Sequence, residues 1–356
     1  MGEAFPQDKC KFAVLVKQMR RLSGTIIFLT LVGLMSFKPK SVVHFIVPKG
    51  WPKPVYDFKK NPLTAGKINL GRALFYDPVL SRDSTISCAS CHLAATAFTH
   101  IDHPLSHGIE GRIGTRNSPT LANLAWNKSF MWDGAVTRID LQPLMPIVNH
   151  TEMDENMEHV VTKLQTGNKY ASLFNKAYGS PNISSDKLLQ AITQFVLTMV
   201  SCNSKYDRVI RGEDTFTVSE QHGYNSFKQN CAVCHTEPLF TNGQFENNGL
   251  ALDESLKDYG QMSVTHNSAD SLKFKVPTLR NIEYTYPYMH DGRFKNLNQV
   301  LNNYIRGLQH GPTLSAKLQN GIYLSNMEKA ELLAFLHTLN DKEFMTNPKF
   351  SEQVSK

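Results

Sequence analysis

Two pentapeptides of the form Cys-x-x-Cys-His carry the clearest chemistry in this sequence. They supply Cys88, Cys91 and His92 in the first copy and Cys231, Cys234 and His235 in the second. This spacing is typical of c-type haem attachment, in which both thiols add to the haem vinyl groups and the adjoining histidine binds the iron as its proximal ligand. The two copies therefore predict two covalently bound haem c groups.

A zinc site built from the four motif cysteines is the alternative interpretation. It would leave both histidines as bystanders, and a zinc ribbon does not need histidine at the same place twice. Of the six cysteines, Cys10 and Cys202 remain. Two thiols cannot form a disulfide framework for a chain of this size, and we expect Cys202 to be a packed or an idle thiol.

Length and charge set further limits. The chain has 356 residues, of which 41% are hydrophobic, and this fits a globular protein of two domains. The net charge of +7 comes mostly from the first forty residues, which hold seven basic and two acidic side chains. Because the remainder is nearly neutral, we expect no nucleic-acid partner.

Residues 1–40 have the pattern of an export leader. Arg20 and Arg21 precede an apolar run from Thr25 to Phe37 of about thirteen residues, which is the length of a secretory h-region and short for a membrane span. A signal peptide is expected, with an uncleaved N-terminal anchor as the alternative. Bacteria attach haem c outside the cytoplasm, so leader and haem motifs together predict a periplasmic protein, either free or anchored to the inner membrane.

The sequence around the two haem motifs is duplicated. Each motif follows a helix with Gly-x-x-x-Phe, at Gly71 and at Gly223, for which Thr64 and Ser219 are the expected N-caps. Downstream, residues 119–134 align without a gap on residues 277–292. The prediction is a mainly α protein with long loops and little β structure, made of two cytochrome c-like haem domains related by internal duplication.

The domain limits follow from the duplication. The first haem domain is expected at about 50–210 and the second at about 211–345. Apolar residues recur at helical spacing in four further segments, and such stripes usually form the core. These segments are 157–164, 185–200, 298–305 and 327–339.

The two copies differ where the alignment is carried past the Asp-Gly pairs. It places Pro146 opposite Tyr304. A tyrosine oxygen can coordinate ferric iron, whereas proline has no side-chain donor. One haem would then be six-coordinate, through His235 and Tyr304, and the other would keep a vacant site for a small ligand. A core tyrosine with a satisfied hydroxyl is the alternative.

Polar residues flank Pro146 on both sides, namely Gln142 and Glu152. A carboxylate beside ferric iron suits peroxide chemistry, because it can accept a proton from bound hydrogen peroxide and return it to the departing oxygen. Glu152 is the candidate for this role. The alternative is a surface carboxylate in an acidic run near a helix start, where negative charge is favourable.

These motifs resemble the bacterial diheme cytochrome c peroxidase family, including its methylamine-utilisation (MauG-type) branch. The resemblance covers about residues 62–342. Besides the two haem motifs, it is carried by the segments 70–77, 116–120, 131–134 and 276–281.

The resemblance implies a peroxidatic N-terminal haem, an electron-transfer C-terminal haem and a calcium ion between the domains. By position, Trp132 matches the tryptophan between the haems, and Gln142 and Glu152 match the distal pair. His107 matches a loop histidine that caps the N-terminal haem in the resting enzyme and leaves on activation, although a solvated loop histidine is the alternative. The implied calcium ligands are Asn117, Thr285 and Pro287.

One departure from the peroxidase pattern concerns the second haem. Peroxidases carry methionine where this chain has Tyr304, as MauG-type enzymes do. A phenolate stabilises ferric iron more than a thioether does, so the second haem is expected at lower potential.

The expected function is reduction of hydrogen peroxide, with electrons from a small cytochrome c or a cupredoxin passing through the second haem to the first. Two alternatives are a MauG-like oxidation of residues on a partner protein and a non-enzymatic diheme electron carrier. Family members are often homodimers.

Overall fold

The computed structural model describes residues 42–353. As predicted, the described part is mainly helical, with short helices joined by long loops. Two two-residue strands, β1 (Phe245–Glu246) and β2 (Phe274–Lys275), form an antiparallel pair that places Phe245 opposite Lys275. The helices are α2 (Ala65–Tyr76), α3 (Cys88–Cys91), α4 (Leu144–Val148), α5 (Met157–Gln165), α6 (Lys169–Tyr178), α7 (Ser185–Leu197), α8 (Lys205–Ile210), α9 (Val218–Asn230), α10 (Met262–Thr265), α11 (Leu297–Arg306), α12 (Asn326–His337) and α13 (Lys342–Thr346).

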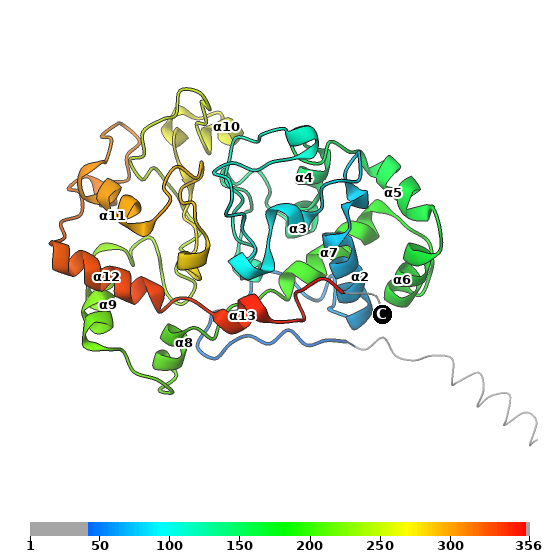
Figure 1. Ribbon diagram of the computed structural model, residues 1–356, viewed down its shortest axis with the longest axis horizontal. Coiled ribbons are helices and arrows are strands. Elements are labelled where there is room, and N and C mark those ends of the chain that lie inside the picture. Colours follow the sequence, from blue (N-terminus) through cyan, green and yellow to red (C-terminus); the bar gives the residue numbers. More distant parts are fainter. Residues whose placement is uncertain (1–41, 354–356) are drawn as a thin grey trace, which may run out of the picture. The chain divides into compact units, whose positions relative to one another are not determined.

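The two Gly-x-x-x-Phe helices each cross another helix at their glycine. A Cβ atom on Gly71 of α2 would lie 1.9 Å from the carbonyl oxygen of Ala191 in α7, and one on Gly223 of α9 would lie 1.9 Å from that of Glu331 in α12. Only glycine allows such an approach. The pairs α2/α7 and α9/α12, on opposite sides in Figure 1, are therefore the same packing unit in two copies.

The loops after the haem motifs repeat the same backbone geometry. Asn123 and Asn281, which are equivalent in the duplication, have φ of 62° and 60°. Met131 and Met289 likewise have φ of 67° and 76°. These left-handed conformations are uncommon outside glycine, so their recurrence at equivalent positions supports the internal duplication.

The predicted helix positions are confirmed, but one N-cap is wrong. Thr64 caps α2 through its hydroxyl, which accepts from the backbone N–H of Lys67. Ser219 lies inside α9, whose N-cap is Thr217. The reason is a full capping box, in which Thr217 accepts from the Glu220 backbone and Glu220 accepts from the Thr217 backbone.

Buried side chains form two hydrophobic clusters. The first contains residues of α2, α5, α6 and α7, and the second contains residues of α9, α11 and α12. Tyr206 of α8 packs in the second cluster, while Phe344 of α13 and Phe350 pack in the first. The domain limits at 50–210 and 211–345 stay a prediction. The packing places α8 with the second cluster and the chain's last described segment with the first.

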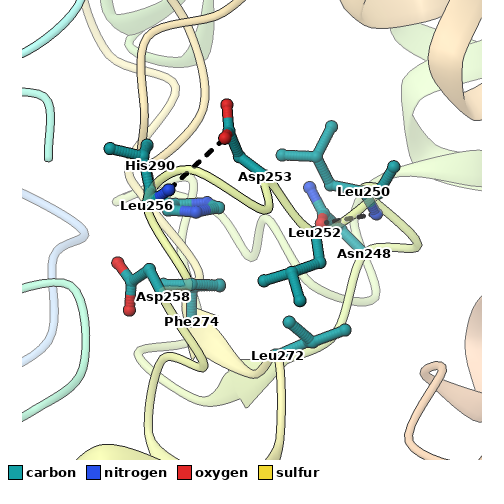
Figure 2. Close-up of a pocket in the computed structure, with 10 residues that line it drawn as sticks. Asn248, Leu250, Leu252, Asp253, Leu256, Asp258, Leu272, Phe274 and His290 are labelled. Carbon is teal, nitrogen blue, oxygen red and sulfur yellow. Dashed lines mark hydrogen bonds between the residues drawn. The ribbon is translucent and has the colours of Figure 1, made fainter. Parts of the chain in front are cut away.

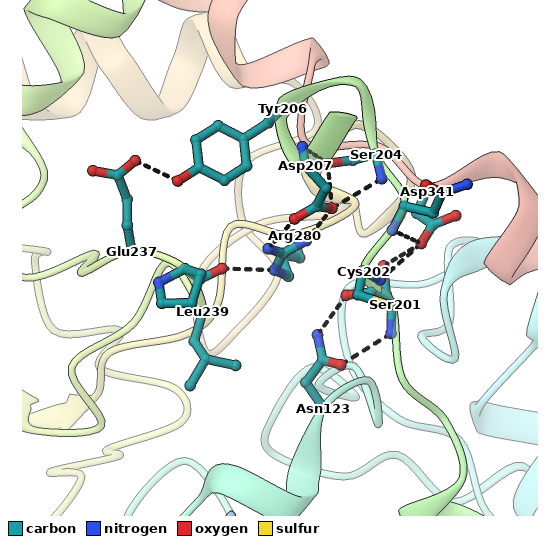
Figure 3. Close-up of polar contacts among 12 residues, drawn as sticks. Asn123, Ser201, Cys202, Ser204, Tyr206, Asp207, Glu237, Leu239, Arg280 and Asp341 are labelled. Atoms are coloured by element: carbon teal, nitrogen blue, oxygen red, sulfur yellow. Dashed lines mark hydrogen bonds and ion pairs between the residues drawn. The ribbon is translucent and has the colours of Figure 1, made fainter. Parts of the chain in front are cut away.

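Arg280 and Asp207 form a buried ion pair (Figure 3). Arg280 is fully buried and donates to both carboxylate oxygens of Asp207, each at 2.8 Å. Burial opposes ionisation of Asp207, but the guanidinium and the hydroxyl and amide of Ser204 outweigh it and lower the carboxyl pKa. The Arg280 guanidinium also lies 4.5 Å from the ring centroid of Trp51.

Equivalent asparagines of the two copies meet at Ser201. Asn123 donates to the carbonyl oxygen of Ser201 at 3.2 Å, and Asn281 donates to its hydroxyl at 3.0 Å. The backbone N–H of Ser201 donates back to the side-chain oxygen of Asn123 at 2.9 Å (Figure 3). A single residue therefore ties both haem-binding loops together. Within residues 42–353, no helix is long and apolar enough to span a bilayer.

Candidate functional site

Both haem motifs open into one cavity of about 600 Å³. Cys91 and His92 line it from the first motif, and Cys231, Cys234 and His235 line it from the second. Cys88 packs against the first hydrophobic cluster. The duplicated sequence therefore builds a shared chamber.

The motif histidines have the tautomer that a proximal ligand needs. His92 Nδ1 lies 2.8 Å from the carbonyl oxygen of Phe98, and His235 Nδ1 lies 3.1 Å from that of Phe240. With the proton on Nδ1, each Nε2 keeps a free lone pair. Burial lowers the pKa of each imidazole to about 4, so both are neutral near pH 7. These residues fit covalently bound haem c.

The distal candidates of the first motif line the same cavity. Gln142, Pro146 and Glu152 are all part of its wall. Glu152 accepts from Asn149 at 2.9 Å, but burial outweighs this bond and raises its pKa above the ordinary carboxyl value. Its charge acts on the Cys91 thiol, so the carboxylate lies close to the first haem motif.

The second motif has Tyr304 as its counterpart. Tyr304 belongs to α11, which begins at the capping box of Asn296 and Gln299, and it lines the cavity. Its hydroxyl accepts from Asn248 at 3.5 Å, and burial raises its pKa to about 12. Pro146 and Tyr304 thus share one chamber, as the duplication requires.

Two backbone hydrogen bonds join equivalent segments of the two modules in the cavity wall. The backbone N–H of Asn117 donates to the carbonyl of His290 at 2.7 Å, and that of Lys275 donates to the carbonyl of Trp132 at 2.8 Å. In the duplication, Asn117 is equivalent to Lys275 and Trp132 to His290. The Trp132 indole donates to the Asn117 carbonyl at 2.8 Å, which fixes the ring in the wall.

A second cavity beneath His290 holds only about 10 Å³ (Figure 2). That is room for about one water molecule. The His290 ring stacks on Phe274 with centroids 3.7 Å apart. His290 is therefore packed in place and lines both cavities.

The implied calcium ligands also belong to the wall of the large cavity. Asn117, Thr285 and Pro287 all line the large cavity. The Asn117 side-chain nitrogen donates to the Pro104 carbonyl at 3.0 Å, which turns the side-chain oxygen the other way. Among residues 42–353, no group of three or more His, Cys, Asp or Glu side chains could hold a metal ion. A calcium site here would depend on amide and main-chain oxygens.

His107 lies near the first motif and contacts another loop histidine. Its carbonyl oxygen is 3.6 Å from the Cys91 sulfur, and its ring lies tilted by 31° against that of His103, with centroids 4.1 Å apart. The ring is half-buried. Its role as a conditional iron ligand stays a prediction.

Sequence analysis did not predict the ion pairs of Arg116 in the cavity wall. Arg116 binds Asp258 at 2.6 Å and Asp133 at 2.6 Å, and these carboxylates come from different haem modules. The available signal was an arginine, Arg116, directly before the predicted ligand Asn117. Lys275, two residues before Pro277, was missed for the same reason.

Comparison with known proteins agrees with this geometry. The family model of di-haem cytochrome c peroxidase matches residues 65–215, and that of cytochrome c matches residues 221–340. The chain is 35% identical to methylamine utilization protein MauG of Methylorubrum extorquens over 306 residues, 83% of each chain. It is 33% identical to cytochrome c551 peroxidase of Nitrosomonas europaea over 293 residues, 81% of this chain and 84% of that one.

A solved structure has the same fold at comparable identity. It is a MauG-like protein associated with microbial copper homeostasis, with a TM-score of 0.78 and 31% identity, covering 87% of this chain and 99% of that one. Two relatives above 30% identity match four fifths of their own length, and the site geometry is that of two haem-binding modules. The chain therefore belongs to the di-haem cytochrome c peroxidase family.

Proposed function

We propose that the protein reduces hydrogen peroxide to water at its first haem-binding module, with electrons that enter through the second. The observation that carries this proposal is the asymmetry of one shared cavity. Pro146 and Glu152 line it beside the first motif, and Tyr304 lines it beside the second. Haem c, which the motif cysteines and histidines would hold, would supply the iron for peroxide binding and electron transfer.

Glu152 acts as the acid and base of the reaction. Reduction of peroxide consumes two protons and two electrons, and one proton must move from the near oxygen to the leaving one. A carboxylate within the cavity can carry that proton both ways. The raised pKa of Glu152 brings it closer to neutral pH, which is where such a group transfers protons best. Gln142, in the same wall, can orient the peroxide through its amide.

Trp132 is the proposed route between the modules. Trp132 lines the cavity of both haem motifs. Its indole N–H donates to the Asn117 carbonyl, and its backbone carbonyl accepts from the Lys275 N–H. A fixed aromatic ring needs little rearrangement when an electron passes. The donor is a small cytochrome c or a cupredoxin.

Tyr304 favours a second candidate, MauG-like oxidation of a residue on a partner protein. A phenolate ligand would lower the potential of the second haem and make it a poorer electron acceptor from a cytochrome. In this version the protein draws electrons from a tyrosine or tryptophan of its partner.

Three further proposals concern the surroundings of the site. Asn117, Thr285 and Pro287 would hold calcium through oxygen atoms, which that ion prefers. The protein would work in the periplasm, as a monomer or homodimer. The export leader behind this location, and any anchoring to the inner membrane, fall in residues 1–40, outside the described part of the chain.

Steady-state turnover tests the proposal. The purified diheme protein, reduced by one electron, is mixed with hydrogen peroxide and reduced cytochrome c or reduced cupredoxin. Rapid donor oxidation that requires peroxide is expected, and it would contradict the MauG-like version. Absence of peroxide consumption with both donors would overturn the proposed function. Absence of any cyanide-binding or high-spin haem would instead indicate an electron carrier.

A further inference from the structure

Lys275 is a half-buried cation for which the proposed reaction has no use. It ends β2, where its register with Phe245 is fixed and its backbone N–H donates to Trp132 at 2.8 Å. The next residue, Val276, donates to Gln244 at 2.8 Å. Hydrogen bonds to Trp132 and Gln244 therefore fix the backbone at Lys275 and Val276.

The side chain of Lys275 crosses from the second module to the first. Its Nζ lies 5.9 Å from the ring centroid of Phe130 and donates to the carbonyl oxygen of Ser129 at 3.0 Å. Ser129, Phe130 and Lys275 all line the large cavity. Lys275 therefore contributes to the wall of the chamber that both haem motifs line.

The Lys275 ammonium group has more hydrogen-bond donors than acceptors around it. It has three N–H donors, and the described residues give it a single acceptor. No carboxylate of residues 42–353 lies within ion-pair distance of it. Asp133 acts on it from farther away, but that carboxylate is already bound by Arg116 at 2.6 Å. Burial consequently lowers the pKa of Lys275 to about 8.

A buried cation is stable when an anion with hydrogen-bond acceptors pairs with it. Haem c is the group that the adjoining motifs would hold, and each haem would supply two propionate carboxylates. We propose that the Lys275 ammonium binds a haem propionate at the wall of the large cavity and holds that haem at a higher reduction potential.

The internal duplication shows that this cation occurs in one of the two copies. Lys275 stands at the position equivalent to Asn117, and each makes the same backbone bond across the wall. The equivalent positions thus carry a cation in the second copy, at Lys275, and an amide in the first, at Asn117. A positive charge near a haem favours the reduced iron, which has one less positive charge. Lys275 is accordingly a positioning residue, and the proposal requires haem binding but not peroxidase activity.

The test compares the midpoint potentials of both haems in the full-length diheme protein. Lys275→Met removes the charge, Lys275→Gln keeps a neutral donor, and Lys275→Arg keeps the cation. Lys273→Met is the matched control on the same segment, because Lys273 binds Asp270 at 3.1 Å and does not line the large cavity. Haem content is measured for each variant, and redox titrations are followed optically.

The expected result is a lower potential for one haem in Lys275→Met and Lys275→Gln, with wild-type values in Lys275→Arg and Lys273→Met. Failure of the two neutral variants to load haem, while Lys275→Arg loads fully, would also support a required cation. Unchanged potentials in fully loaded Lys275→Met would overturn the proposal, as would failure of all three Lys275 variants to load.

A free anion from solution could occupy the same place. Titrations are therefore repeated in chloride and in phosphate at rising concentration. Potentials of the wild type that do not respond to either anion support a covalently tethered propionate. A potential that falls with anion concentration in the wild type and not in Lys275→Met would overturn the propionate assignment in favour of a solution anion.

Discussion

Replacement of Glu152 by glutamine gives the sharpest test of the proposed chemistry. Glutamine has the same shape and keeps an oxygen that can accept from Asn149, which donates to Glu152 at 2.9 Å. The amide cannot carry a proton at neutral pH. The variant therefore changes the proton transfer and little of the packing around it.

The size of the effect follows from the role. A positioned acid and base contributes about 10² to 10⁴-fold to a rate. At about 1.4 kcal/mol for each tenfold, the loss of Glu152 would raise the barrier by about 3 to 5 kcal/mol. We expect kcat/KM for peroxide to fall by that factor in Glu152→Gln, with the haem content unchanged.

The assay is peroxide-dependent oxidation of a reduced donor, measured over a range of pH. Burial raises the pKa of Glu152, and the ionised carboxylate is the base, so wild-type activity should fall as the pH drops through a value above the ordinary carboxyl range. Glu152→Gln should lose this acid limb. Glu158→Gln is the matched control, since Glu158 is an exposed residue in the first turn of α5. Equal kcat/KM for wild type and a fully loaded Glu152→Gln would refute the role of this carboxylate.

Three further predictions concern the ligand and the fold. Tyr304→Phe should abolish the low-spin resonance signal of one ferric haem, and an unchanged signal would exclude coordination by that oxygen. Arg280→Ala should lower the free energy of unfolding by about 3 to 5 kcal/mol, because it leaves the Asp207 carboxylate buried without its partner; a loss below 1 kcal/mol in denaturant titrations would contradict this. Gly223→Ala should destabilise the protein by about 1 to 3 kcal/mol in the same titrations, because its methyl group would meet the α12 backbone at 1.9 Å. Gly212→Ala is the control: it has open space around it and tests only the cost of a positive φ.

Local patterns in the sequence account for much of this molecule. The two haem motifs are contiguous pentapeptides, so their chemistry needs no tertiary information. The helices at α5, α7, α11 and α12 follow apolar spacing, which is a property of neighbouring residues. The glycines at the helix crossings were also readable, because the duplication repeats them. The missed N-cap at Thr217 was equally local, and the Thr-x-x-Glu capping box was its available signal.

The tertiary structure alone decided how the two modules face each other. Lys275 and Trp132 are far apart in the sequence, and only folding brings their backbones to 2.8 Å. The same holds for Arg116, whose two carboxylate partners come from different modules. Periodicity and spacing describe what each segment can form by itself. Burial and charge pairing between distant segments depend on the packed state, and these set the pKa of Glu152 and the surroundings of Lys275.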